Sequence, residues 1–222
     1  MADVKQHIIE KSDKLRYLKL HEEMPDTAMT ISEAIKISTA KSHQALEKLI
    51  VDQIKQMATI NDYTRLLGLF YSYFGALELL IAKHILPDML QDIHERRKSG
   101  LISQDLLRLG APVPDLPRPG FLPAVKNQYE AFGALYVMEG SSLGGIHIVK
   151  MIQRKLPEIS DATLFFSGYG DRTLEMWQRF KNILDNISGG EVVFESIQSG
   201  ARDTFLKFAE WIHSNIRLKM LT

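Results

Sequence analysis

Apolar residues recur at helical spacing along most of the chain. The clearest run lies between Tyr63 and Leu86, where large apolar side chains return every three or four residues until Pro87 ends the pattern. Upstream, the order Thr30-Ile31-Ser32-Glu33 is that of a capping box, which predicts a helix from there to about Val51. No segment alternates apolar and polar residues as a strand does, and no internal repeat is present. The pattern predicts an all-α fold.

The rest of the chain divides into further predicted helices. Two short ones are expected at about 88–98 and 103–109. Residues 110–123 hold five of the eight prolines and predict an extended connector, because proline lacks an N–H donor and restricts the residue before it. Beyond it, the pattern predicts a long helix from near Pro123 to near Leu156, a loop at 160–171, a helix at 172–187 and a last helix at 191–217.

The predicted domain organisation is simple. Residues 1–29 are rich in charge and have only weak helical periodicity, so we expect an N-terminal arm or a peripheral helix there. Residues 30–222 are expected to form one helical domain, since the proline-rich connector lies between helices and does not separate two cores.

Composition and charge exclude several classes of function. The 222 residues carry 27 basic and 27 acidic side chains, so their net charge of zero gives no support for a nucleic-acid partner. The absence of cysteine excludes disulfides, thiolate metal ligands and a cysteine nucleophile. No uninterrupted apolar run reaches the length of a membrane span, and the N-terminus lacks a secretory signal pattern. We therefore expect a cytoplasmic protein that does not bind a membrane.

The predicted helix at 123–156 contains an unusual number of glycines. Gly140, Gly144 and Gly145 fall within six residues, and on the known helix propensities they together cost about 2–3 kcal/mol relative to alanine. Helical spacing places Gly133, Val137, Gly140 and Gly144 on one stripe. A stripe without side chains admits a close neighbour, which is either another helix or a flat ligand.

A second candidate surface lies on the helix that starts at Ile31. Lys36, Thr39, His43 and Glu47 follow one another at helical spacing, so they share a stripe. Glu47 lies four residues after His43 and can orient its imidazole as a metal ligand. Each of these residues alone is more often an ordinary surface or partly buried side chain. Together with the glycine stripe, they indicate a flat, anionic, metal-containing ligand, and heme fits that description.

At this point the sequence resembles the heme oxygenase family, in its bacterial, biliverdin-producing branch. The first matching motif is Lys36-x-x-Thr39-x-x-x-His43-x-x-x-Glu47, and the second is the stretch from Tyr136 to Gly145. A weaker match is Phe165-Phe166 ahead of Arg179-Phe180-Lys181. The resemblance covers about Ile31 to the C-terminus. It implies a single-domain multihelical bundle with a glycine-kinked distal helix.

The resemblance also implies roles for particular residues. His43 would be the axial ligand of the heme iron, with Gly140, Gly144 and Gly145 on the opposite face of the porphyrin. Lys36 and Lys181 would lie near the propionates, where a charge-assisted hydrogen bond is stronger than a neutral one. Arg179 and Tyr136 are further candidates for the propionates. Phe165, Phe166 and Phe180 would be pocket walls, although ordinary core aromatics explain them equally well.

One residue departs from the family pattern. Many members have an aspartate directly after the first distal glycine, where it organises water around bound oxygen, and this chain has Ser141 there. A serine hydroxyl can donate and accept, and backbone groups can also hold water. Glu139 points about 100° away from Gly140 around the helix axis, so we do not expect it to replace the aspartate. The resemblance therefore implies a distal water network in place of an acidic side chain.

The function implied by the resemblance is oxidative cleavage of heme to biliverdin, carbon monoxide and ferrous iron. Heme would be both substrate and cofactor, and an external electron donor such as a ferredoxin or a flavoprotein reductase would supply the electrons. A heme carrier or sensor on the same fold is the main alternative. A thiamin-related hydrolase, a di-iron carboxylate protein and a helical scaffold with a tight glycine crossing are the others.

Overall fold

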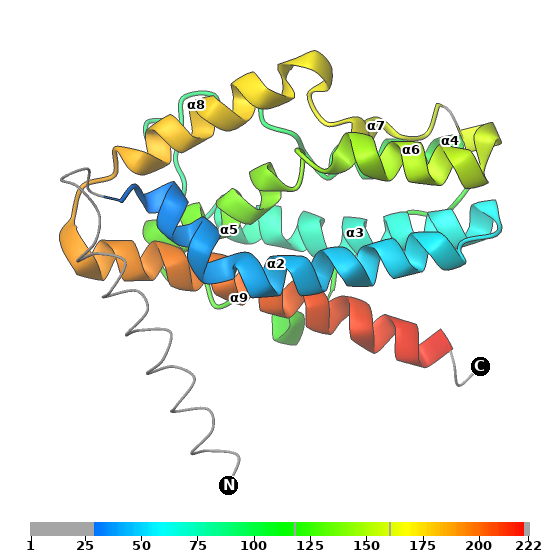
Figure 1. Ribbon diagram of the computed structural model, residues 1–222, viewed down its shortest axis with the longest axis horizontal. Coiled ribbons are helices and arrows are strands. Elements are labelled where there is room, and N and C mark those ends of the chain that lie inside the picture. The colour runs from blue at the N-terminus through cyan, green and yellow to red at the C-terminus, as the bar shows by residue number, and fades with distance from the viewer. Residues whose placement is uncertain (1–28, 118, 160, 220–222) are drawn as a thin grey trace, which may run out of the picture. The chain divides into compact units, whose positions relative to one another are not determined.

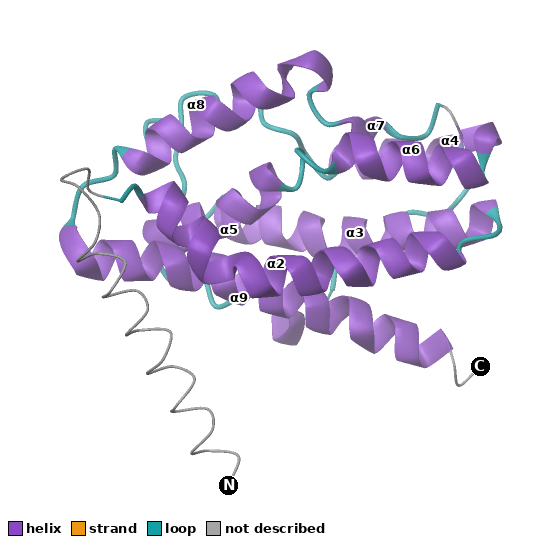
Figure 2. Ribbon diagram, viewed as in Figure 1, coloured by secondary structure: helices purple, strands orange, loops and turns teal. Residues whose placement is uncertain are grey.

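The computed structural model describes residues 29–117, 119–159 and 161–219 (Figure 1). Within those ranges the chain forms helices and turns and no strand, so the prediction of an all-α fold is confirmed (Figure 2). Residues 1–28, which make up almost all of the predicted arm, lie outside the described residues.

The helices follow the predicted order, with three differences. Two are treated below, and the third is a four-residue helix at Leu164–Ser167 within the loop predicted at 160–171. The α-helices are α2 (Ile31–Gln56), α3 (Ile60–Ile81), α4 (Gly100–Arg108), α5 (Gln128–Gly140), α6 (Gly145–Lys155), α7 (Leu164–Ser167), α8 (Thr173–Asp185) and α9 (Gly190–Lys219). In Figure 1, α2 runs along the front of the bundle and α8 lies above it. Among its described residues, the predicted proline-rich connector between α4 and α5 has no regular secondary structure apart from a 3₁₀ turn at Pro119–Phe121.

Helix α3 forms the centre of the apolar core. It begins with a reciprocal capping box, in which the Thr59 side chain accepts from the backbone N–H of Asp62 and the Asp62 carboxylate accepts from the backbone N–H of Thr59. The helix ends at Ile81, five residues before the predicted end. By length and composition alone, this helix could cross a membrane. However, 56% of its apolar 18-residue stretch is buried inside the protein.

The helix predicted at 88–98 is wrong, because this segment is a series of turns. Most of its backbone hydrogen bonds join residues three apart, as in Ile93 N–H to Leu90 O and Glu95 N–H to Asp92 O, and they do not continue as an α-helical ladder. Arg96 and Arg97, to which the sequence analysis assigned no role, are buried in the structure. Side-chain contacts of these two arginines fix the segment in a conformation that its apolar periodicity did not predict.

The single long helix predicted from Pro123 to Leu156 is two helices, α5 and α6, separated by residues 141–144. Through this break the N–H of Leu143 donates to Gly140 O and the N–H of Gly145 donates to Ser142 O, so the turns are tighter than α-helical. The hydroxyls of Ser141 and Ser142 donate to the carbonyls of Met138 and Glu139. Hydroxyls that bond to nearby carbonyls in this way compete with the helical ladder and favour a bend.

Helices α5 and α9 cross with their backbones in contact. A Cβ atom on Gly133 would lie 2.0 Å from Ile197 O, and a Cβ on Gly200 would lie 2.1 Å from Glu130 O. No side chain fits at those distances, so glycine at both positions lets the two helices touch. Part of the glycine stripe therefore serves a helix crossing, which was one of the two predicted alternatives.

We expect Gly200→Ala to lower the free energy of unfolding, by about 1–3 kcal/mol or more, because the added methyl group overlaps the backbone of α5. Thermal and urea unfolding of the heme-free protein measure this loss. Gly100→Ala is the matched control, since nothing lies within 4 Å of its added Cβ and alanine favours a helix. Equal unfolding temperatures for the two variants would contradict the crossing.

Candidate functional site

A cavity of about 510 Å³ lies where α2, α8 and α9 meet the break between α5 and α6. This volume is within the range of sites that bind small molecules and cofactors, about 300–1,000 Å³. The cavity brings together most of the predicted site residues, namely Lys36, Thr39, His43, Glu47, Tyr136, Gly140, Ser141, Gly144, Phe166 and Lys181. The two surfaces singled out in the sequence therefore line the same cavity.

His43 lies on the α2 side of this cavity. Its Nε2 atom is 3.4 Å from Glu47 Oε1, so the expected contact between imidazole and carboxylate is present. The edge of the imidazole also packs against Phe205, with 5.4 Å between ring centroids. The imidazole is 51% exposed and the carboxylate 59%. With one ring nitrogen facing a carboxylate, the other is free to bind a metal.

Tyr136 and Thr39 occupy buried positions near the N-terminal part of α2. The Thr39 hydroxyl donates to Ile35 O at 2.7 Å, so its donor is used within its own helix. The Tyr136 hydroxyl lies 3.5 Å from Ser32 O, and burial raises the pKa of this phenol to about 12. Tyr136 is thus a neutral wall of the cavity.

Two hydrogen bonds join α2 to α8 at this end of the cavity. The backbone N–H and the hydroxyl of Ser32 donate to the two carboxylate oxygens of Asp185, at 2.7 and 2.8 Å. Lys181 lies one turn before Asp185 and lines the cavity, with its Nζ atom 5.9 Å from the centroid of the Trp177 ring. This end of the cavity therefore carries the cationic side chains of Lys36 and Lys181.

Aromatic side chains form much of the cavity wall. Phe70 packs against Phe166 and Phe208, with 5.2 and 5.1 Å between ring centroids. Phe166 was expected as a pocket wall, whereas Phe70 and Phe208 belong to the apolar patterns of α3 and α9 and were not predicted as parts of a site. The complete set of lining phenylalanines is Phe70, Phe74, Phe165, Phe166, Phe205 and Phe208. Such a lining suits a flat apolar ligand.

The glycines of the α5–α6 region have different surroundings. A Cβ on Gly144 would meet nothing within 4 Å, and a Cβ on Gly140 would lie 3.6 Å from the Trp177 ring. Gly145 does not line the cavity as expected. A Cβ there would lie 1.9 Å from Phe166 O, so Gly145 is in contact with the backbone of α7. Gly140 and Gly144 border the cavity, whereas Gly145 fixes the position of its phenylalanine wall.

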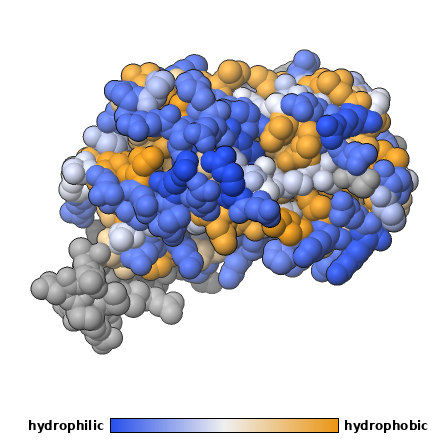
Figure 3. Space-filling view, turned by 90° about the horizontal axis from the view of Figure 1, so that it is seen from above, coloured by the Kyte–Doolittle hydropathy of each residue, from blue (hydrophilic) through white to orange (hydrophobic). Residues whose placement is uncertain are grey.

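Two predicted residues of α8 lie away from the cavity. Arg179 is exposed, with its guanidinium 2.7 Å from Glu175 and 4.0 Å from Glu95. Phe180 is buried in the core and stacks on Trp177 at 5.9 Å between centroids. Residues four apart share a helix face, so Trp177 and Lys181 point into the cavity and Arg179, two positions from each, points away. Figure 3, which views the protein from above relative to Figure 1, shows a face on which hydrophilic residues are interspersed with hydrophobic patches.

The sequence analysis did not identify Arg97, which lines the cavity beside Ser141. One Nη2 proton of Arg97 donates to Met138 O at 2.7 Å, and Nη2 also donates to the Ser141 hydroxyl. Its Nη1 donates to Phe165 O at 3.3 Å. Burial lowers the pKa of this guanidinium. In the sequence, only the pair of adjacent arginines at 96 and 97 could have indicated a role for Arg97. The helix predicted at 88–98 gave no reason to place either arginine in a site.

Arg96 lies at the centre of a buried polar network that contacts α5 on the side away from the cavity. Its guanidinium donates to Glu139 at 3.0 Å and to Asp92 at 2.5 Å. The Tyr169 hydroxyl donates to Glu139 at 2.9 Å, and burial raises the pKa of this phenol. Glu139 thus points away from the cavity, as the helical angle predicted, and links α5 to the segments at 92–97 and 169.

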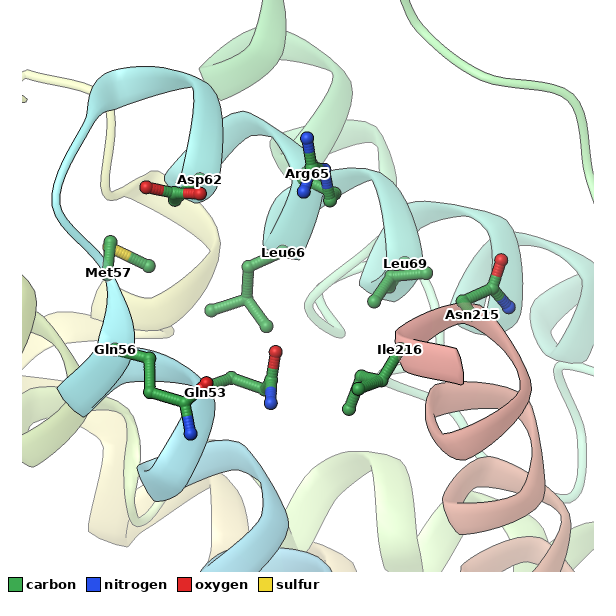
Figure 4. Close-up of a pocket in the computed structure, with 9 residues that line it drawn as sticks. All are labelled: Gln53, Gln56, Met57, Asp62, Arg65, Leu66, Leu69, Asn215 and Ile216. Carbon is green, nitrogen blue, oxygen red and sulfur yellow. The ribbon is translucent and has the colours of Figure 1, made fainter. Parts of the chain in front are cut away.

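A second cavity of about 120 Å³ lies between the end of α2, the start of α3 and the end of α9 (Figure 4). None of the predicted site residues lines it. No group of three or more His, Cys, Asp or Glu side chains that could hold a metal occurs within the described ranges. The described part of the chain therefore offers no support for the di-iron alternative.

The fold and the larger cavity define a multihelical protein with a pocket for a flat ligand between a histidine-bearing helix and a glycine-bearing helix break. The chain belongs to the heme oxygenase family, a family of oxidoreductases. The family model for heme oxygenase matches residues 122–214, from just before α5 to within α9.

Individual heme oxygenases match a larger part of the chain. The heme oxygenase PigA of Pseudomonas aeruginosa is 28% identical over 180 residues, which cover 81% of this chain and 89% of that protein. A heme oxygenase of Xanthomonas campestris pv. campestris is 31% identical over 113 residues, or 51% of this chain and 66% of that protein.

A solved structure confirms the fold. The heme oxygenase of Neisseria meningitidis, solved with NO and CO bound, superposes with a TM-score of 0.72 at 20% identity. The superposition covers 84% of this chain and 92% of that one. The multihelical single-domain fold expected from the sequence is therefore confirmed.

We expect Glu139→Gln to lower the free energy of unfolding by about 3 kcal/mol, because the change leaves the buried Arg96 guanidinium without one of its two carboxylate partners. Urea unfolding of the heme-free protein measures the difference. Glu195→Gln is the matched control: its ion pair with Arg202 is exposed and should contribute less than about 1 kcal/mol. A loss no larger than that of the control would show that the network does not stabilise the fold.

Proposed function

We propose that this protein is a heme oxygenase that uses O₂ and an external reductant to cleave heme to biliverdin, carbon monoxide and ferrous iron. The proposal rests mainly on one observation: His43 on α2 and the glycine-bordered break between α5 and α6 line the same cavity. Relatives named as heme oxygenases match 81% and 51% of the chain and support the same activity.

The residues of the cavity suit heme as substrate. Its walls carry six phenylalanines, which match the apolar faces of a porphyrin, and its volume of about 510 Å³ is that of a cofactor site. Lys36 and Lys181 supply cations for the two propionates. His43 supplies an imidazole, which is the usual protein ligand of heme iron in oxygen-handling proteins.

Each group of residues has a distinct task in the proposed reaction. His43 holds the iron, and Glu47 orients its imidazole. Gly140 and Gly144 leave space on the opposite side for a small ligand, and Ser141 lies at the border of that space. The phenylalanines exclude bulk water, and the two lysines fix the angle of the porphyrin in its plane. Bound heme itself supplies the oxygen-activating iron and the carbon that is oxidised.

The proposed partners follow from the electron requirement of this chemistry. Cleavage of heme by O₂ consumes electrons in every turnover, so the proposal includes an external donor such as a ferredoxin or a flavoprotein reductase. We place the reaction in the cytoplasm, where such donors occur, without a nucleic-acid or membrane partner.

The direct test adds heme to the purified protein and then a reductant under air. We expect uptake of one heme per chain, followed by loss of the Soret band, a biliverdin spectrum and release of chelatable ferrous iron. A heme complex that persists unchanged with reductant and air would instead identify a carrier or sensor. Failure to bind heme would exclude both functions.

We expect His43→Ala to remove the spectrum of histidine-ligated heme and to abolish turnover, because α2 then offers no nitrogen ligand at this position. Optical and electron paramagnetic resonance spectra of the ferric complex measure the ligation. His147→Ala is the matched control, since His147 is exposed on α6 and does not line the cavity. An unchanged spectrum in His43→Ala would show that another group binds the iron.

We expect the double variant Lys36→Ala, Lys181→Ala to bind heme about tenfold more weakly or worse, since two charge-assisted hydrogen bonds are lost. We also expect it to change the ratio of biliverdin isomers, because the porphyrin can then rotate in its plane. Chromatography of the products measures the ratio. Lys48→Ala on the same helix is the control, because Lys48 is exposed and paired with Asp52. Unchanged affinity and product ratio would remove both lysines from the site.

A further inference from the structure

Arg97 is a buried cation that no carboxylate neutralises directly. It is 8% exposed, and it forms no ion pair with any residue within the described ranges. Its three acceptors are neutral oxygens: the carbonyls of Met138 and Phe165 and the hydroxyl of Ser141. The nearby carboxylate of Glu139 is bonded to Arg96 and Tyr169. A buried charge is costly unless it is paired, so this guanidinium has capacity for an anion.

The guanidinium also has donors to spare. Arginine carries five side-chain N–H groups. One Nη1 proton and the two Nη2 protons account for the three hydrogen bonds of Arg97. Within the described part of the chain, the Nε proton and the second Nη1 proton have no acceptor. Because Arg97 lines the cavity, a ligand there can reach these donors.

Ser141, in contrast, has no donor left for a ligand. Its only hydroxyl proton goes to Met138 O at 2.6 Å, while its oxygen accepts from Arg97. The hydroxyl therefore holds the guanidinium against the carbonyl end of α5. Many family members have an acidic side chain at the position of Ser141. In this chain the position carries a neutral hydroxyl that is hydrogen-bonded to the cationic side chain of Arg97.

The position of Arg97 is fixed from several sides. Its backbone N–H donates to the Tyr169 hydroxyl at 2.7 Å, and its guanidinium lies over the Phe165 ring at 4.1 Å from the centroid. Nearby, the Glu78 carboxylate accepts from the backbone N–H and the hydroxyl of Ser99, which fixes the chain directly after the arginine. A donor held in place before a ligand arrives stabilises negative charge without reorganisation.

We propose that Arg97 is an anion-stabilising residue of the cavity, which interacts with a small negatively charged ligand on the heme iron at the side of Gly140 and Ser141. This inference rests on the proposed binding of heme by His43. In this proposal, the buried side chain of Arg97, which is hydrogen-bonded to Ser141, stabilises negative charge on the side of the heme that faces Gly140. Small anions such as fluoride, azide and hydroxide are the class of ligand that this wall favours over neutral ligands.

The test titrates the ferric heme complex with fluoride and with azide and follows the optical spectrum. We expect Arg97→Met to weaken the affinity for both anions about tenfold or more, because a hydrogen bond from a charged donor is lost. The affinity of the ferrous complex for neutral CO should change less than threefold. The infrared stretch of bound CO should move to higher frequency, since a nearby positive charge has been removed.

Arg202→Met is the matched control, because Arg202 is exposed on α9 and paired with Glu195. It should leave anion affinities and the CO stretch unchanged. Equal anion affinities in Arg97→Met and the control would overturn the inference. So would a loss of heme affinity in Arg97→Met with unchanged anion affinity, which would instead assign Arg97 to a propionate.

If Arg97→Met does not fold, the variant Ser141→Ala tests whether Arg97 or Ser141 donates to the anion. This change removes an acceptor from Arg97 and frees one more N–H, so anion affinity should stay the same or increase. A tenfold loss would show that the serine hydroxyl is the donor and would overturn the assignment to Arg97. Absence of heme binding by the unaltered protein would refute the proposed function itself, so the two failures are distinguishable.

Discussion

The contact of two helix backbones at Gly133 and Gly200 is the constraint on which the cavity depends. Because no side chain separates α5 from α9, both helices lie close to the core, and α5 reaches the cavity with its C-terminal end. That end carries Gly140 and Ser141 opposite the stripe of α2 that carries His43. A side chain at Gly133 or Gly200 would move α5 away from α9 and would separate Gly140 and Ser141 from the α2 stripe that carries His43.

A second backbone contact fixes the other side of the α5–α6 break. Gly145 touches the carbonyl of Phe166, so the first turn of α6 is held against α7. The carboxylate of Asp105 accepts from the backbone N–H groups of Leu164 and Phe165 and secures α7 from behind. The break is therefore a fixed feature between two anchored helices, and the phenylalanine wall and the glycine wall are positioned together.

Most of the fold could be predicted from the sequence, because hydrophobic periodicity is strong in α3, α8 and α9. The two largest errors share a physical cause. At 88–98 and at 141–144, side-chain hydrogen bonds override a helical pattern, and periodicity carries no information about such bonds. The same limit applies to the site. Spacing along one helix identified the α2 stripe, whereas Arg97 reaches the cavity through contacts with residues 41 to 68 positions away.

The two ends of the cavity are held with very different strength. Beside Arg97, a buried network of ion pairs and backbone contacts joins four segments of the chain. Beside Lys36 and Lys181, two hydrogen bonds from Ser32 to Asp185 join α2 to α8. Two hydrogen bonds contribute less than the buried network, so opening the cavity beside Lys36 and Lys181 would cost less free energy than opening it beside Arg97. For the proposed reaction, we therefore expect the substrate to enter and the product to leave at the end of the cavity that carries Lys36 and Lys181.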